Sequence, residues 1–482
     1  MEAEEEVVSI RLVYGADNDA EREVRISCPD ATGLGCDVTR MLLDFGLRIV
    51  HGDMSTDGKW CFLIFRVALC CSVPAHWPLL KTRLEKICPR SQGAQALWRW
   101  NSRGQEPLQH PFLLQVTSYN REGVLHDLMH VLWEADVAVF KAHITTGPSE
   151  KVLDLFWIYD NKKELPENHR ILQICDLVKD CVGQQDAKCS ISPAPAGSCA
   201  DDSTSALLKR CACKDAKPAA SLRKITSHRK SSNSVQSDLS SWQGSQSEEY
   251  GHGREEVQVA IDNSTTSAYS LINIVCKDRK GLVYDLMRTV KDIHIRVAYG
   301  KVLVRQDYMC EADLFVQEVD GSQITEQEAQ DELIERVKQA AALPVVISIQ
   351  DVYDETCTEL LVLANLDSGA RGRPRVTYDV TAALNAMQLC VFMADVYIES
   401  PGGAGEQRPQ ELHRFLVHCI DGCRLRSAAE KRSMYECVHA SLTGTELVST
   451  PFPAQLSDCA KRTEQEAARH ATGGKLFQRW KW

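Results

Sequence analysis

The sequence predicts an α+β protein built from tandem ferredoxin-like modules, each with the element order βαββαβ. A glycine-centred pattern occurs three times, with Asp or Asn three residues before the glycine and Asp four residues after it. A β-branched apolar run precedes each glycine, and apolar residues spaced by three and four follow it, which indicates a strand and then a helix. Two further apolar runs and a second helical stretch complete the split βαβ order in each repeat.

The three repeats keep the same spacing beyond the glycine. Their loops are Asp30–Leu34, Asn120–Val124 and Asp278–Leu282, centred on Gly33, Gly123 and Gly281. Fourteen residues after each glycine a second β-like run begins, at Leu47, Val137 and Ile295. A third apolar run then follows, at Trp60–Val67, Val152–Tyr159 and Ala312–Val319. Such a fixed register is typical of repeated structural units.

A fourth, degenerate copy aligns without gaps when Asp379 is placed on Asp37. In this alignment Arg375 occupies the position of the glycine, and Gly369 and Gly372 lie just upstream. We therefore expect a rebuilt loop at the start of the first helix in this copy.

The second helices and closing strands complete the expected modules. We expect second helices at Leu79–Cys88, Glu167–Cys181, Glu326–Ala342 and Ser427–Ser441. We expect closing strands at Ala96–Trp100 and Val345–Ile349. The predicted boundaries are residues 1–107, 108–183, 255–353 and 354–449 for the modules, with a Ser/Lys-rich linker at 184–254 and a tail at 450–482. The linker composition is typical of disorder, and we expect the same of the tail.

Composition and charge exclude several classes of protein. A formal net charge of −11 repels phosphate backbones, which argues against a nucleic-acid partner. The sequence has no apolar run of 18 residues, so we expect no membrane partner. Its acidic start, Met1–Glu6, is unlike a secretion signal, so we expect a cytoplasmic or nuclear protein with reduced cysteines. We expect no metal and no cofactor, because paired Cys-x-x-Cys motifs are missing.

The repeated Asp-x-x-Gly-Leu motif at a strand-to-helix junction resembles the ACT domain, a regulatory amino-acid-binding module. The stretch Asp278–Thr289, together with Ala298–Gly300 and Asp313–Gln317, is similar to the plant ACT-domain-repeat (ACR) proteins. That family resembles the C-terminal regulatory region of bacterial uridylyltransferase without its catalytic domains. The resemblance covers about residues 20–180 and 255–445. It implies amino-acid sensing by a non-catalytic protein.

The loop chemistry fits a free amino acid as an effector. A helix N-terminus offers unpaired N–H groups and a positive dipole end to a carboxylate, and glycine permits close approach. A nearby carboxylate or amide can hold an ammonium group. The candidate ligand-binding residues are Asp30, Gly33, Leu34, Asn120, Gly123, Val124, Asp278, Gly281 and Leu282.

Two other interpretations of the same residues remain open. Asp30, Asn120 and Asp278 could cap helices, while Asp37, Asp127 and Asp285 fit first-turn charges that complement the helix dipole. The modules could also form a ligand-independent interaction scaffold, because exposed sheet edges need to be paired or covered. Protein partners or self-association are expected in either case. The phosphate-binding, nucleophile-elbow and zinc-protease motifs are missing from the sequence, so an enzyme is not expected.

Overall fold

A computed structural model describes residues 6–13, 21–70, 75–89, 111–147, 151–194, 257–342, 345–352, 357–399, 410–419 and 423–445. The chain divides into two compact units. Unit 1 comprises residues 1–108, 255–391 and 397–481, and unit 2 comprises residues 109–254 together with Phe392–Val396. The predicted α+β class with repeated βαββαβ-type units is confirmed, and the units are described separately below.

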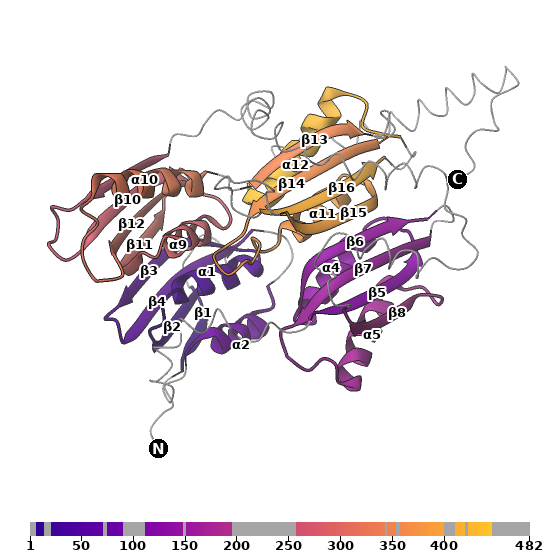
Figure 1. The fold of residues 1–482 in the computed structure, drawn as a ribbon, viewed down its shortest axis with the longest axis horizontal. Coiled ribbons are helices and arrows are strands. Elements are labelled where there is room, and N and C mark those ends of the chain that lie inside the picture. The colour runs from indigo at the N-terminus through magenta and orange to yellow at the C-terminus, as the bar shows by residue number, and fades with distance from the viewer. Residues whose placement is uncertain are drawn as a thin grey trace, which may run out of the picture. The chain divides into compact units, whose positions relative to one another are not determined.

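In unit 1, modules 1 and 3 share one antiparallel sheet with the strand order β1-β2-β4-β3-β11-β12-β10-β9 (Figure 1). Module 1 consists of β1 (Val8–Leu12), β2 (Arg22–Pro29), α1 (Leu34–Asp44), β3 (Leu47–Thr56), β4 (Trp60–Leu69) and α2 (Trp77–Ile87). Module 3 consists of β9 (Gln258–Asp262), β10 (Ser270–Lys277), α9 (Leu282–Asp292), β11 (Arg296–Val304), β12 (Met309–Gln317) and α10 (Gln327–Ala341).

The remaining elements form modules 4 and 2. Module 4 consists of β13 (Val345–Val352), β14 (Cys357–Asn365), α11 (Val376–Ala386), β15 (Cys390–Glu399), β16 (Gln410–His418) and α12 (Ala428–Thr443), with β14 between β13 and β16. Module 2, in unit 2, consists of β5 (Phe112–Tyr119), α4 (Val124–Glu134), β6 (Val137–Thr146), β7 (Lys151–Asp160), α5 (Asn168–Val182) and β8 (Lys188–Pro193). Its strand order is β8-β5-β7-β6, and residues 393–396 of β15 pair with β6.

The origin of the edge strand differs between modules. In module 2, β8 follows α5 and pairs with β5, which completes the βαββαβ order. In modules 1, 3 and 4 the corresponding edge strand precedes the module, as β1, β9 or β13. The strand expected at Val345–Ile349 exists, but it pairs with β14 of module 4 instead of closing module 3. The same pleated, β-branched sequence can fill either edge, so the pattern alone did not identify its partner.

The predicted linker begins too early. The strand β8 lies inside the segment 184–254, because Cys189 and Ile191 pair with β5. Module 2 therefore extends to at least Pro193. The rest of the predicted linker from residue 195, the tail at 450–482 and the strand expected at Ala96–Trp100 lie outside the described residues.

Each first helix begins after one residue with left-handed backbone conformation. The φ angles are 83° at Gly33, 74° at Gly123, 81° at Gly281 and 66° at Arg375. The predicted glycine positions and the alignment of Arg375 with them are confirmed. In the fourth loop the residue type differs, but the backbone conformation does not: Arg375 has the left-handed conformation that glycine adopts in the other copies. A non-glycine residue there costs about 1–2 kcal/mol, so its side-chain contacts must offset that cost.

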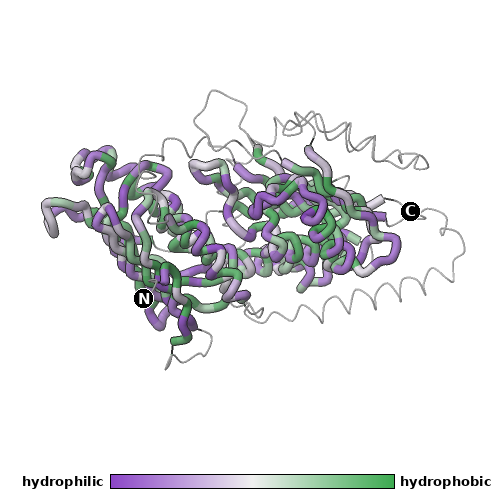
Figure 2. The backbone as a smooth tube through the Cα atoms, turned by 90° about the horizontal axis from the view of Figure 1, so that it is seen from below, coloured by the Kyte–Doolittle hydropathy of each residue, from purple (hydrophilic) through white to green (hydrophobic). Residues whose placement is uncertain are grey.

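Modules 1 and 3 join through antiparallel pairing of β3 with β11. The register places Gly52 opposite Val302 and Gly300 opposite Met54. A Cβ atom on Gly300 would lie 2.6 Å from Met54 Cε, so a larger residue here would require the end of the Met54 side chain to shift. The pairing covers an edge of each sheet and sets α1 beside α9. Figure 2 shows that apolar stretches alternate with polar ones along the backbone.

We predict that Gly123→Ala lowers the free energy of unfolding of module 2 by about 1–2 kcal/mol, because alanine is strained at φ 74°. Gly123→Asn should cost less, since asparagine adopts the left-handed conformation more readily. Urea unfolding followed by circular dichroism measures both variants. Equal stability of Gly123→Ala and wild type would contradict the conformational requirement.

Candidate functional site

The three predicted loops share backbone geometry but differ in what covers them. In each, the glycine is the N-cap and makes no side-chain cap hydrogen bond. Leu34, Val124 and Leu282 open the helices and are buried in the module cores. They therefore anchor the loops and do not offer a surface to a ligand in this conformation.

The module 1 loop is partly exposed and lies among charged groups from modules 3 and 4. Thr56 Oγ1 donates a hydrogen bond of 2.7 Å to the Asp30 carboxylate. The aliphatic end of Lys291, on α9, covers Gly33, with Cε 2.8 Å from a Cβ placed there. The Lys291 ammonium is 3.6 Å from Asp37, which also accepts a 2.9 Å hydrogen bond from Arg371. The α1 N-terminus, the Asp37 carboxylate and the Lys291 ammonium group thus meet at the module 1 loop.

The module 2 loop lies in unit 2 and is also partly exposed at Asn120 and Gly123. Arg121 stabilises it, because Nη2 lies 2.7 Å from Asp127 and donates to the Cys181 carbonyl at 3.0 Å. Asp127 is therefore an ion-pair partner as well as a first-turn charge.

The module 3 loop is covered. Asp278, Arg279 and Lys280 are at most 7% exposed. The Lys280 amide donates to the Thr443 carbonyl, at the end of α12, and the Arg373 guanidinium lies over Gly281. Residues of module 4 thus occupy the approach to this loop.

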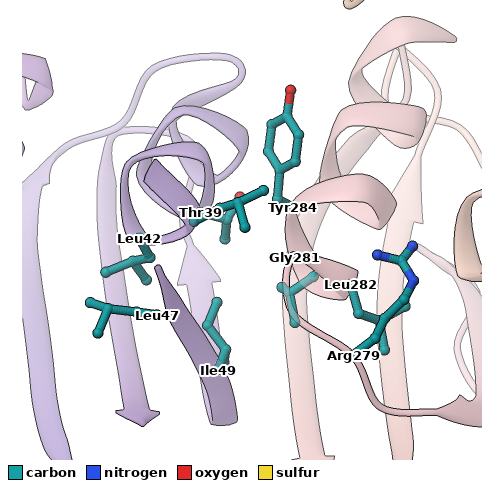
Figure 3. Close-up of a pocket in the computed structure, with 10 residues that line it drawn as sticks. Thr39, Leu42, Leu47, Ile49, Arg279, Gly281, Leu282 and Tyr284 are labelled. Carbon is teal, nitrogen blue, oxygen red and sulfur yellow. The ribbon is translucent and has the colours of Figure 1, made fainter. Parts of the chain in front are cut away.

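A small cavity lies between modules 1 and 3, beside Gly281. Figure 3 shows Leu42, Leu47 and Ile49 of module 1 facing Gly281 and Leu282 of module 3. Its volume is about 10 Å³, which suits no more than one water molecule. An amino acid would enter here only if side chains moved apart.

A buried set of exchanged ion pairs joins modules 3 and 4. Lys280 of module 3 contacts Asp379 of module 4 at 2.7 Å, while Arg373 of module 4 contacts Asp285 of module 3 at 3.4 Å. Arg279 also binds Asp285, at 2.7 Å. The carboxylates of Asp285 and Asp379 are 0% and 4% exposed. Each helix N-terminus thereby receives a cation from the opposite loop.

Helix C-termini balance the excess positive charge in this cluster. The Arg279 Nη2 atom donates to the carbonyls of Ala340 and Ala342 at the end of α10. Lys280 Nζ donates to the Ser441 carbonyl at the end of α12. Carbonyls at a helix C-terminus carry partial negative charge, so they stabilise buried cations.

Four functional residues were not predicted from the sequence: Lys280, Arg373, Lys291 and Arg371. The repeat alignment holds a signal for one of them. Arg121, Arg279 and Arg373 each stand two residues before the left-handed residue. Asp127 and Asp285 each follow it by four and pair with an arginine from that position. The alignment could therefore have indicated an ion pair, although not that Arg373 would reach another module.

The described residues hold no cluster of three or more His, Cys, Asp or Glu side chains arranged to bind a metal ion. Within the same residues, every helix is too short or too polar to cross a membrane.

This fold, with a left-handed glycine before each first helix and modules joined edge to edge, defines a protein of ACT-like domains. The sequence matches the families described as "ACT domain-containing protein ACR10, N-terminal" at residues 14–89, "ACR9-like, ACT-like domain" at 258–352 and "ACT domain-containing protein ACR9, C-terminal" at 358–444. ACT domains generally act as regulatory modules that bind small molecules such as amino acids.

Comparison with curated proteins identifies the family. The chain is 33% identical to ACT domain-containing protein ACR10 of Arabidopsis thaliana over 400 residues, which cover 82% of this chain and 89% of that protein. It is 30% identical to ACR9 of the same plant over 422 residues, which cover 87% and 94%. The chain belongs to the ACR9/ACR10 family of plant ACT domain-containing proteins. Neither relative is named for a catalytic activity.

Burial raises the pKa of the Asp278 carboxyl from 3.8 to about 6, although Arg48, 3.4 Å away, opposes the shift. The native state therefore binds more protons than the unfolded state between about pH 4 and 6, so stability falls as pH rises through this window. We predict that Asp278→Asn removes this slope and raises stability at pH 8 by about 2 kcal/mol.

Urea unfolding at several pH values measures this effect. Arg48→Met, which removes the opposing cation, is the matched control and should extend the loss of stability to higher pH. A wild-type slope in Asp278→Asn would show that another group titrates.

Proposed function

We propose that the protein is a non-catalytic sensor that binds a free amino acid at the module 1 loop and passes the signal to protein partners. The observation that carries the proposal is the partly exposed Gly33 loop, which begins at Asp30 and is covered only by the flexible end of Lys291. The Asp30 carboxylate, which accepts a hydrogen bond from Thr56, would accept the ammonium group. The α1 N-terminus and Lys291 would bind the carboxylate.

The contrast with module 3 supports this choice of loop. Module 3 matches the ACR pattern most fully in sequence. Its loop is at most 7% exposed at residues 278–280 and carries Arg373 over Gly281. Lys291 over Gly33 is instead the flexible end of a long side chain, which can move at low cost. The loop of module 2 remains a second proposed site.

A ligand-independent scaffold is the alternative function. The paired edges of β3 and β11 and the buried ion pairs between modules 3 and 4 favour it, because both hold modules together without a ligand. The two functions differ in whether a small molecule stabilises the folded chain.

We predict that at least one of the twenty amino acids raises the thermal midpoint of the full chain. A ligand that binds only the native state adds about 2.7 kcal/mol at a hundredfold excess over its dissociation constant. Asp30→Asn keeps an acceptor for Thr56 but removes the charge, and it should weaken binding by about tenfold or more, as for loss of a charge-assisted hydrogen bond. Differential scanning fluorimetry and calorimetry measure the effect.

Lys291→Met should weaken binding of the same amino acid. Glu328→Gln, on the exposed side of α10, is the matched control and should leave binding unchanged. Absence of binding for every amino acid at millimolar concentration would favour the scaffold. Binding that survives Asp30→Asn but is lost in Asn120→Ala would move the site to module 2.

A further inference from the structure

We propose that the module 3 loop is a guanidinium-binding site and that Arg373 of module 4 is its built-in ligand. The Arg373 side chain is fully buried, and its Nη2 donates to the Lys280 carbonyl at 3.0 Å. Its Nε lies 3.4 Å from Asp285 Oδ1 and 3.5 Å from Oδ2. A carbonyl and a carboxylate thus receive the N–H groups along one edge of the planar guanidinium, which is the geometry that selects arginine over lysine.

Gly281 is the residue that admits this group. A Cβ at Gly281 would lie 2.4 Å from Arg373 Nη2, closer than any real contact of that kind. The glycine thus permits close approach of a bound group, which is the role expected of it in ligand recognition, but the bound group belongs to the same chain.

Electrostatics make the site specific for a cation. A helix N-terminus alone repels positive charge. At α9 the fully buried carboxylate of Asp285 reverses this preference, and it is shared between Arg279 and Arg373. The Arg279 guanidinium has further partners at the end of α10, so the vacated site would still hold a carboxylate facing an open position.

The fit of Arg373 is incomplete. Its buried Nη1 atom has no hydrogen-bond partner among the described residues, and its contacts with Asp285 are long for an ion pair. A buried donor without a partner destabilises the bound arrangement. Arg373 is therefore a displaceable occupant, unlike the short Arg279–Asp285 pair.

The segment Asp367–Arg375 connects this occupant to the other modules. Arg371 contacts Asp37 of module 1, and Arg375 donates to the Asp44 carbonyl at the end of α1. Displacement of Arg373 would disturb these neighbouring contacts. A free guanidinium compound must compete with a tethered group whose effective concentration is in the millimolar range or above, so the intact chain should respond weakly to free arginine.

Arg373→Ala in the full chain tests the proposal by chemical rescue. The substitution removes the atoms of N-ethylguanidinium, so this compound should raise the lowered thermal midpoint of Arg373→Ala in a saturable manner at millimolar concentration. Ethylammonium, which has the charge without the planar fork, should not. Arg371→Ala is the matched control: its side chain lies in the same segment but is 42% exposed, and rescue is not expected.

Equal effects of the two compounds, no rescue of a folded Arg373→Ala, or the same rise in wild type and Arg371→Ala would each overturn the proposal. If Arg373→Ala does not fold, Arg373→Lys provides the test, since it keeps the charge but cannot bridge Lys280 and Asp285. Faster hydrogen exchange at the amides of residues 281–286 in Arg373→Lys supports the site. Unchanged exchange there contradicts it.

Discussion

The antiparallel pairing of β3 with β11 is the contact on which the rest of unit 1 depends. It merges the sheets of modules 1 and 3, and it sets α1 beside α9 with their loops at the same boundary. Lys291 reaches Gly33 and Arg48 reaches Asp278 because of this register. Neither glycine loop is therefore surrounded by its own module alone.

The loops of modules 3 and 4 differ from those of modules 1 and 2 in that buried ion pairs join them to each other. A buried ion pair contributes little net stability, but breaking one by removing a partner is costly. The exchange of Lys280 and Arg373 between modules 3 and 4 makes each loop dependent on the other. We infer that these pairs select which module packs against which, a role that apolar contacts between similar repeats perform less well.

The sequence predicted the local features of this structure and missed the long-range ones. Glycine spacing located the left-handed residues, and the alignment of Arg375 with them was correct although its residue type differs. Those features depend on backbone conformation within a few residues. The partner of β13 and the burial of Asp278 depend on residues that are distant in sequence. Hydrophobic periodicity gives no information about such contacts. Of the candidate site, the loops were predicted, whereas Lys291 and Arg373 required the fold.

The early position of β13 gives modules 3 and 4 a mechanical linkage. Residues 342–344 are all that separate the end of α10 from this strand, so the connection spans roughly 14 Å at most. The connection therefore limits how far the end of α10 can move away from the start of β13, and a larger displacement of module 3 from module 4 would have to pull this edge strand from its sheet.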